Sequence, residues 1–242
     1  TNLRTDREQP GVWISGFFGS GKSHLAKMLR ALWVNQGFSD GAYARNIPDL
    51  PTETKDYFVE LSNVAQRYGG LHAASGTLGA GADNNVRMAL LNIVFKSAGL
   101  PEQYHQARFV MWLKKKGIFD DVKAFVEAEG DNWADELEDL YVSRSIANAL
   151  LQKDSDLAGT AKEVRNVLLA QYPNINDVTN QQMVDAIHDA LEVDGNFPLT
   201  LIVLDEVQQY VGHDSDKAHQ VQEMVETCCK HSKFKSKLLF VA

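Results

Sequence analysis

Residues 16–23 constrain the fold of this chain more than any other stretch. They read GFFGSGKS, which has the form G-x-x-x-x-G-K-[ST]. A short apolar run at residues 12–15 precedes them, and a helical pattern that begins at His24 follows them. Because a phosphate-binding loop joins a strand to a helix, this context predicts such a loop here rather than a glycine-rich turn that matches by chance.

The residue types in this loop suit the binding of a nucleotide phosphate. Glycine at three of its positions lets the backbone come close to phosphate oxygens, because glycine has no Cβ. Backbone N–H groups then surround the anion at the positive end of the following helix. Lys22 is expected to reach the β- and γ-phosphates and to act in catalysis, and the Ser23 hydroxyl is expected to hold Mg²⁺. The residues expected to bind the nucleotide lie in the loop and at the start of the helix: Gly16, Gly19, Ser20, Gly21, Lys22, Ser23 and His24.

A second motif occupies residues 199–206. It reads LTLIVLDE, an apolar run that ends in two carboxylates. Such a run predicts a buried parallel strand, and open α/β sheets bind ligands at the carboxyl ends of their strands. We expect Asp205 to belong to the Mg²⁺ shell with Ser23, and Glu206 to be a catalytic residue that orients or deprotonates an attacking water. Together the two motifs predict a site for ATP and Mg²⁺.

Short segments elsewhere also have the character of strands. The full set of expected strands is 12–15, 57–61, 199–204 and 237–242. The phosphate-loop helix is expected over residues 24–36, where apolar residues recur at helical spacing. Residues 69–83 contain five glycines but no second G-K-[ST], and we interpret them as a flexible linker in preference to a switch or partner-binding loop.

Much of the chain between residues 86 and 193 has helical periodicity. The patterns that begin at Thr160 and Thr179 match capping boxes, each just before an apolar stripe. So many helices exceed a single crossover between two parallel strands. We therefore expect one P-loop domain over residues 1–242, with a helical insertion at about residues 64–196.

Charge and composition limit the classes of partner. The formal net charge is −8, so contact with nucleic acid needs a local basic patch. Residues 114–116 are the obvious basic run, which we interpret as the solvated end of a helix. Cys228 and Cys229 are adjacent, which suits neither a structural disulfide nor a zinc site. The apolar runs are shorter than the roughly 20 residues of a membrane span, and no signal-peptide pattern opens the sequence. These features predict a cytoplasmic protein without a membrane partner.

The two motifs resemble those of a known group of large ATPases. GFFGSGKSHLAKML and VLDEVQQYVG are similar to stretches of the P-loop ATPases of bacterial BREX phage-exclusion systems, the BrxC family, and of their PglY relatives from phage growth limitation. Phe17, Phe18 and His24 match this group in addition to the generic motif residues, and the second stretch is similar through Gly212. Residues 117–140 resemble the helical segment of the family less specifically.

This resemblance implies properties that the residues alone do not. Members of the family are AAA+-like ATPases that act with other defence proteins to block phage DNA replication and to mark host DNA by methylation. An α/β P-loop fold of the AAA+/ASCE type is implied, with a parallel sheet flanked by helices and with ATP and Mg²⁺ as ligands. Lys22 and Ser23 match the Walker A residues, and Asp205 and Glu206 match the Walker B pair. Other BREX proteins and further copies of the chain are the implied partners, and DNA contact is left open.

The family pattern continues past the end of this sequence. In such ATPases the strand after the Walker B motif ends in a polar sensor of the γ-phosphate, and a fifth strand pairs beside the first. The sequence ends at Ala242, before both features. We therefore expect the N-terminal portion of a longer protein, with an incomplete sheet and with its first strand at an exposed edge. Sensor and arginine-finger residues would then lie outside this chain.

Two functions are open from the sequence. An ATPase would use hydrolysis to drive or gate a conformational change in a defence assembly. A nucleotide-gated scaffold would hold ATP with little turnover and recruit partners through the helical insertion. Glu206 directly after Asp205 favours hydrolysis, because a scaffold needs no water-orienting carboxylate. A GTPase is disfavoured, since the D-x-x-G match at residues 156–159 follows no apolar strand and precedes no N-K-x-D, and nothing supports a small-molecule kinase.

Overall fold

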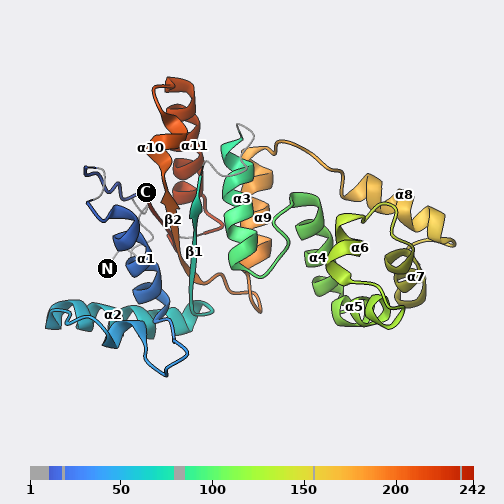
Figure 1. Ribbon diagram of the computed structural model, residues 1–242, viewed down its shortest axis with the longest axis horizontal. Helices are drawn as coiled ribbons and strands as arrows, with labels where there is room; N and C mark the ends of the chain where they lie inside the picture. Colours follow the sequence, from blue (N-terminus) through green and yellow to red (C-terminus); the bar gives the residue numbers. More distant parts are fainter. Residues whose placement is uncertain (1–10, 18–19, 79–84, 155, 235) are drawn as a thin grey trace. The chain divides into compact units, whose positions relative to one another are not determined.

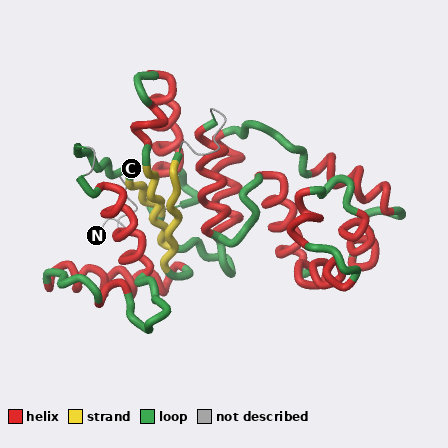
Figure 2. Tube along the Cα trace, in the orientation of Figure 1, coloured by secondary structure: helices red, strands yellow, loops and turns green. Residues whose placement is uncertain are grey.

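The computed structural model describes residues 11–17, 20–78, 85–154, 156–234 and 236–242. The chain divides into two compact units. The sheet unit comprises Thr1–Ala98 and Asp177–Ala242, and the helical unit comprises Gly99–Asn176. Figure 1 labels the helices and the strands β1 and β2, and Figure 2 shows the strands of the sheet unit in yellow. In chain order the helical unit therefore separates two parts of the sheet unit.

Within the described residues, three parallel strands form the sheet. They are β1 (Leu71–Thr77), β2 (Leu199–Asp205) and β3 (Leu238–Val241), in the order β1-β2-β3. Every residue of the central strand β2 except Asp205 is buried. A parallel strand that is buried on both faces has a continuous apolar sequence, as residues 199–204 do. The strand predicted at this position is present, so the prediction is confirmed. The mixed α/β architecture, a parallel sheet flanked by helices, is also as expected.

The segment before the phosphate loop pairs with β3 but does not form a full strand. The Val12 N–H donates to the Phe240 carbonyl oxygen at 2.8 Å, and the Ile14 N–H donates to that of Ala242 at 2.7 Å. The strand predicted over residues 12–15 is thereby reduced to a single parallel bridge. Within the described part of the chain this segment pairs with no strand on its other side, so it forms an edge of the sheet.

Helices cover both faces of the sheet. On one face, Trp33 and other apolar residues of α1 (Lys22–Val34) pack on the sheet side chains Ala73, Leu201, Val203 and Val241. Successive side chains of a strand point to opposite faces. The other face carries α3 (Val86–Ser97) against β1 and α11 (Ser215–Lys230) against β3, and α9 (Asn180–Leu191) packs on α3 (Figure 1).

The strand predicted over residues 57–61 is wrong. These residues lie within α2 (Thr52–Ala65), which begins directly after Pro51. Five residues that read YFVEL are too few to separate a strand period from a helix period. The helix is exposed along most of its length, and Ala65 is its buried residue.

The linker interpretation of residues 69–83 is also wrong, because this segment contains β1. Ala73 and Ala74 have low strand propensity, yet both are buried in the sheet. Pairing along the whole of β2 and packing between α1 and α3 stabilise the strand, so tertiary context outweighs local preference. Residues 79–84 of this segment lie outside the described residues.

The helical unit packs its helices around an apolar core. They are α4 (Tyr104–Lys116), α5 (Phe119–Ala128), α6 (Trp133–Glu138), α7 (Arg144–Lys153) and α8 (Ala161–Gln171). Phe109, Leu113, Leu140 and Ile146 are fully buried in this core. The basic run at residues 114–116 is the exposed last turn of α4, as predicted, where cations complement the helix dipole.

The predicted helical insertion starts too early. Its expected range of 64–196 includes β1, and the helices between β1 and β2 begin with α3 at Val86. The capping box predicted at Thr179 is present. That at Thr160 is half formed: its hydroxyl accepts from the Glu163 N–H, but the Glu163 carboxylate accepts from the Gly159 N–H. No helix within the described residues is long and apolar enough to cross a membrane.

Gly76 of β1 gives a test of how α3 packs on the sheet. A Cβ added at Gly76 would lie 2.6 Å from Cγ1 of Ile93 on α3, so the close approach of strand and helix depends on glycine. We expect Gly76→Ala to lower the free energy of unfolding by about 1–3 kcal/mol, measured by urea denaturation. Gly37→Ala is the matched control, since its Cβ would meet only the Tyr43 ring, at 3.5 Å. Gly76→Ala should lower the free energy of unfolding by less when Ile93 is also replaced by alanine. Additive effects of the two substitutions would contradict the contact.

Candidate functional site

The phosphate-loop sequence leads directly into the first turn of α1. α1 begins at Lys22 after Gly21, whose φ of 87° lies in the left-handed region that glycine favours. At Gly16 an added Cβ would lie 2.9 Å from the Ser20 hydroxyl oxygen, so a larger residue there would require the Ser20 side chain to move. Gly19, expected to bind phosphate, lies outside the described residues.

Lys22 points back into the loop. Its Nζ donates to the carbonyl oxygens of Gly16 at 2.7 Å and Phe17 at 2.8 Å. A carbonyl oxygen carries only a partial charge, so it is a weaker partner for an ammonium group than a phosphate oxygen. An anion that enters the loop can therefore take over the ammonium group from these carbonyls.

The two sequence motifs meet at a hydrogen bond between Ser23 and Asp205. Ser23 Oγ donates to Asp205 Oδ1 at 3.0 Å, across 182 positions of sequence. Asp205 is the last residue of β2, and Ser23 lies in the first turn of α1. β3 runs parallel to β2, and the segment at Val12 runs parallel to β3. The carboxyl ends of all three, and the loop that follows residue 15, therefore lie at the same end of the sheet. The structure thus brings together the two residues predicted as metal ligands.

Glu206 follows Asp205 and redirects the chain. Its φ of 57° and ψ of 26° are left-handed, a conformation that costs a non-glycine residue about 1–3 kcal/mol. The short helix α10 (Val207–Val211) starts directly after it. The Glu206 backbone N–H donates to Asp205 Oδ1 at 3.0 Å. The Glu206 side chain is exposed at the same edge as the Ser23–Asp205 pair, where a ligand can reach its carboxylate.

A cavity of about 690 Å³ lies between the motifs, and we call it the edge cavity. Its volume falls in the range of about 300–1,000 Å³ that is usual for small-molecule sites. It combines one cation with two carboxylates, which suits a ligand that carries both phosphates and a metal ion. The predicted site residues that line it are Gly16, Ser20, Gly21, Lys22, Ser23, His24, Asp205 and Glu206.

The oxygen atoms at this edge fit Mg²⁺. Hydroxyl and carboxylate oxygens are hard donors, and Mg²⁺ is commonly held by one or two carboxylates together with water and substrate phosphates. Ser23 Oγ and Asp205 Oδ1 already lie side by side, at 3.0 Å. The donor set therefore matches the metal that the sequence motifs imply.

Trp13, Gln208 and Gln209 lie outside the generic phosphate-loop and Asp-Glu motifs, although both glutamines belong to the stretch VLDEVQQYVG that resembles BREX ATPases. Trp13 lies in the edge segment, and Gln208 and Gln209 lie in α10; all three line the cavity. The available signal is their position, directly before the phosphate loop and directly after the Asp-Glu pair. For Gln208 and Gln209 this position is informative only once the backbone turn at Glu206 is known, because that turn sets the direction of α10.

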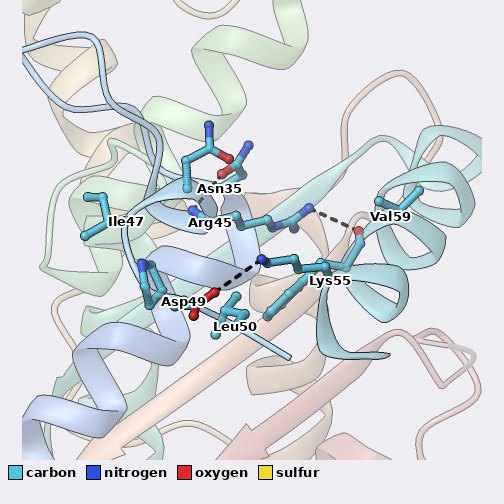
Figure 3. Close-up of a pocket in the computed structure, with 10 residues that line it drawn as sticks. Asn35, Arg45, Ile47, Asp49, Leu50, Lys55 and Val59 are labelled. Atoms are coloured by element: carbon cyan, nitrogen blue, oxygen red, sulfur yellow. Dashed lines mark hydrogen bonds and ion pairs between the residues drawn. The ribbon is translucent and has the colours of Figure 1, made fainter. Parts of the chain in front are cut away.

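A second cavity, of about 640 Å³, lies at the other end of α1 (Figure 3). Arg45, in the turn η2 (Ala44–Asn46), holds its wall together. The guanidinium Nε donates to the Leu32 carbonyl oxygen at 2.7 Å, and Nη2 donates to that of Trp33 at 2.6 Å. Nη1 donates to Ser62 Oγ on α2 at 2.7 Å. Arg45 thus joins the last turn of α1 to α2.

The electrostatics of this second cavity suit a structural role for Arg45. Its guanidinium lies 4.6 Å from the centre of the Phe58 ring, and burial lowers its pKa from the usual value. Lys55 and Asp49 form an exposed ion pair at 3.6 Å, visible in Figure 3, and such pairs contribute little to stability. The hydrogen bonds of Arg45, rather than this ion pair, therefore hold the wall.

Substitution of Arg45 tests this link. We expect Arg45→Met to lower the free energy of unfolding by about 1–3 kcal/mol, because several carbonyl and hydroxyl acceptors lose their donor. Arg45→Lys should restore little, since an ammonium group cannot replace the planar fork. Arg67→Met, at an exposed arginine in η3 (Gln66–Tyr68), is the control. Equal stability of the Arg45 and Arg67 variants in urea denaturation would show that Arg45 is dispensable.

Two comparisons bear on the identity of the chain. No protein-family model matches it. No solved structure matches it at a significant level. A functional assignment therefore rests on the residues of the edge cavity and on their geometry.

Proposed function

We propose that this chain is a P-loop NTPase of the AAA+/ASCE type that binds ATP with Mg²⁺ in the edge cavity and hydrolyses it. The observation that carries the proposal is the Ser23–Asp205 hydrogen bond at 3.0 Å. A glycine-rich turn or an acidic strand end is weak evidence by itself. Their convergence across 182 positions supports a single nucleotide site built from both.

Each residue of the site has a role that its chemistry suits. Lys22 exchanges its two carbonyl partners for the β- and γ-phosphate oxygens and neutralises part of their charge. Ser23 and Asp205 hold Mg²⁺, which when bound supplies further charge neutralisation. Glu206 orients the attacking water and accepts its proton. In support, the Glu206 backbone N–H donates to Asp205 Oδ1 at 3.0 Å, and both residues line the edge cavity.

The resemblance of the two motifs to BREX ATPases extends the proposal to a cellular role. The chain would act as a motor or switch in an anti-phage defence assembly, with other BREX proteins and further copies of itself as partners. Any contact with DNA would need a local basic surface, because the chain carries a net charge of −8.

Replacement of Lys22 tests nucleotide binding. We expect Lys22→Ala to weaken ATP binding about 10- to 100-fold in isothermal titration calorimetry, because charge-assisted hydrogen bonds of about 1.5–3 kcal/mol are lost. Lys27→Ala, at an exposed lysine of the same helix, is the matched control. Equal ATP affinity of Lys22→Ala and the wild type would overturn the site assignment.

Replacement of Glu206 separates hydrolysis from binding. Glu206→Gln should keep ATP affinity and slow phosphate release about 100-fold or more, since a water-positioning base is removed. Glu138→Gln, at an exposed position of the helical unit, is the control. Wild-type protein that binds ATP but releases no phosphate, even with partners and DNA present, would favour the nucleotide-gated scaffold instead.

A further inference from the structure

The orientation of α10 is fixed by two buried side chains. Val207 and Tyr210 are 4% and 8% exposed, and Lys217 lies 5.1 Å from the centre of the Tyr210 ring. Gln208 and Gln209, between them, are exposed and line the edge cavity. The buried face of α10 therefore holds the two glutamines at the wall of the cavity.

Gln209 occupies a special position relative to Glu206. Glu206 is the N-cap of α10, and Gln209 is the third residue after it. Glu206 is left-handed and no side chain caps α10, so the glutamine at this position does not form a capping box, and Gln209 lines the edge cavity instead. The Gln209 N–H donates to the Glu206 carbonyl oxygen at 3.0 Å, which fixes the two residues against each other. Gln208 instead lines both the edge cavity and an apolar groove beside α11, so it belongs to the wall between them.

The usual task of a glutamine at this position is already taken. In a capping box its side chain would accept from the N-cap N–H. Here the Glu206 N–H donates to Asp205 Oδ1 at 3.0 Å instead. Within the described residues the Gln209 amide has no hydrogen-bond partner, although its neighbour Asp205 has two. The amide therefore retains its acceptor and donor capacity for a ligand in the edge cavity.

We propose that Gln209 is a further catalytic residue of this site, whose amide holds the attacking water in line with the terminal phosphate. This inference rests on the proposed function. An amide offers an acceptor for a water proton and a donor for a phosphate oxygen, whereas the Glu206 carboxylate can only accept. In the step, the water oxygen bonds to the γ-phosphorus and the bond to the β–γ bridging oxygen breaks. ADP leaves with that electron pair, and the water proton passes to Glu206.

The test compares a ground-state ligand with a mimic of the transition state. Affinities for Mg²⁺–ADP and for Mg²⁺–ADP with aluminium fluoride are measured by calorimetry on wild-type chain and on Gln209→Ala. We expect ADP affinity to stay within about twofold, and affinity for the fluoride complex to fall about tenfold or more, the size of one lost hydrogen bond to a charged group. Phosphate release from ATP should slow about 100-fold. Gln220→Ala, at an exposed glutamine of α11, is the matched control.

The outcomes separate this inference from the proposal on which it rests. A Gln209→Ala chain that keeps the wild-type ratio of the two affinities overturns the role of Gln209, even where Lys22→Ala and Glu206→Gln behave as expected. An equal loss of affinity for the fluoride complex in Gln208→Ala also overturns the role of Gln209, because the effect would then belong to α10 as a whole. Failure of the nucleotide proposal would show differently, as equal ATP affinity of wild type and Lys22→Ala. Because Gln209 is exposed, we expect Gln209→Ala and the wild type to have the same thermal unfolding midpoint, which shows that the fold is kept.

Discussion

The register of the central strand β2 is the constraint on which the rest of the sheet unit depends. β1 and β3 both pair with β2, and its last residue, Asp205, lies opposite Thr77 at the edge. A slip by one residue would turn every side chain of β2 to the other face. The contacts of β2 with α1 would then be lost, and the Asp205 carboxylate would no longer meet Ser23. The same pairing therefore determines both the core and the chemistry at its edge.

α1 spans β2 from end to end, and side-chain hydrogen bonds fix it at both ends. Ser23 at its start donates to Asp205, and the Trp33 indole N–H near its end donates to the Leu199 carbonyl oxygen at 3.1 Å. Arg45 then ties the last turn of the helix to α2. The helix that follows the glycine-rich loop is thus hydrogen-bonded to both ends of the strand that ends in Asp205.

The sequence predicts those parts of the fold in which two or more local sequence patterns indicate the same element. β2 combines a continuous apolar run with a position before two carboxylates, and α1 combines helical spacing with a preceding glycine loop. β1 has no such signal, because Ala73, Ala74 and Gly76 become a strand only through their pairing with β2 and the close approach of α3. The site divides in the same way. Motif spacing identifies Lys22 and Asp205, whereas the role inferred for Gln209 depends on a backbone turn that no local pattern announces.

The place of the helical unit in the chain has a consequence for folding kinetics. β1 and β2 are neighbours in the sheet, yet the whole helical unit lies between them in sequence. Closing so long a loop before any contact forms is entropically unfavourable, and folding slows as contacts become less local. The contacts among helices α4 to α8 lie within the helical unit, so these helices can form before β1 and β2 pair. The edge cavity needs β2 to be paired, so we expect it to be among the last parts of a newly made chain to take shape.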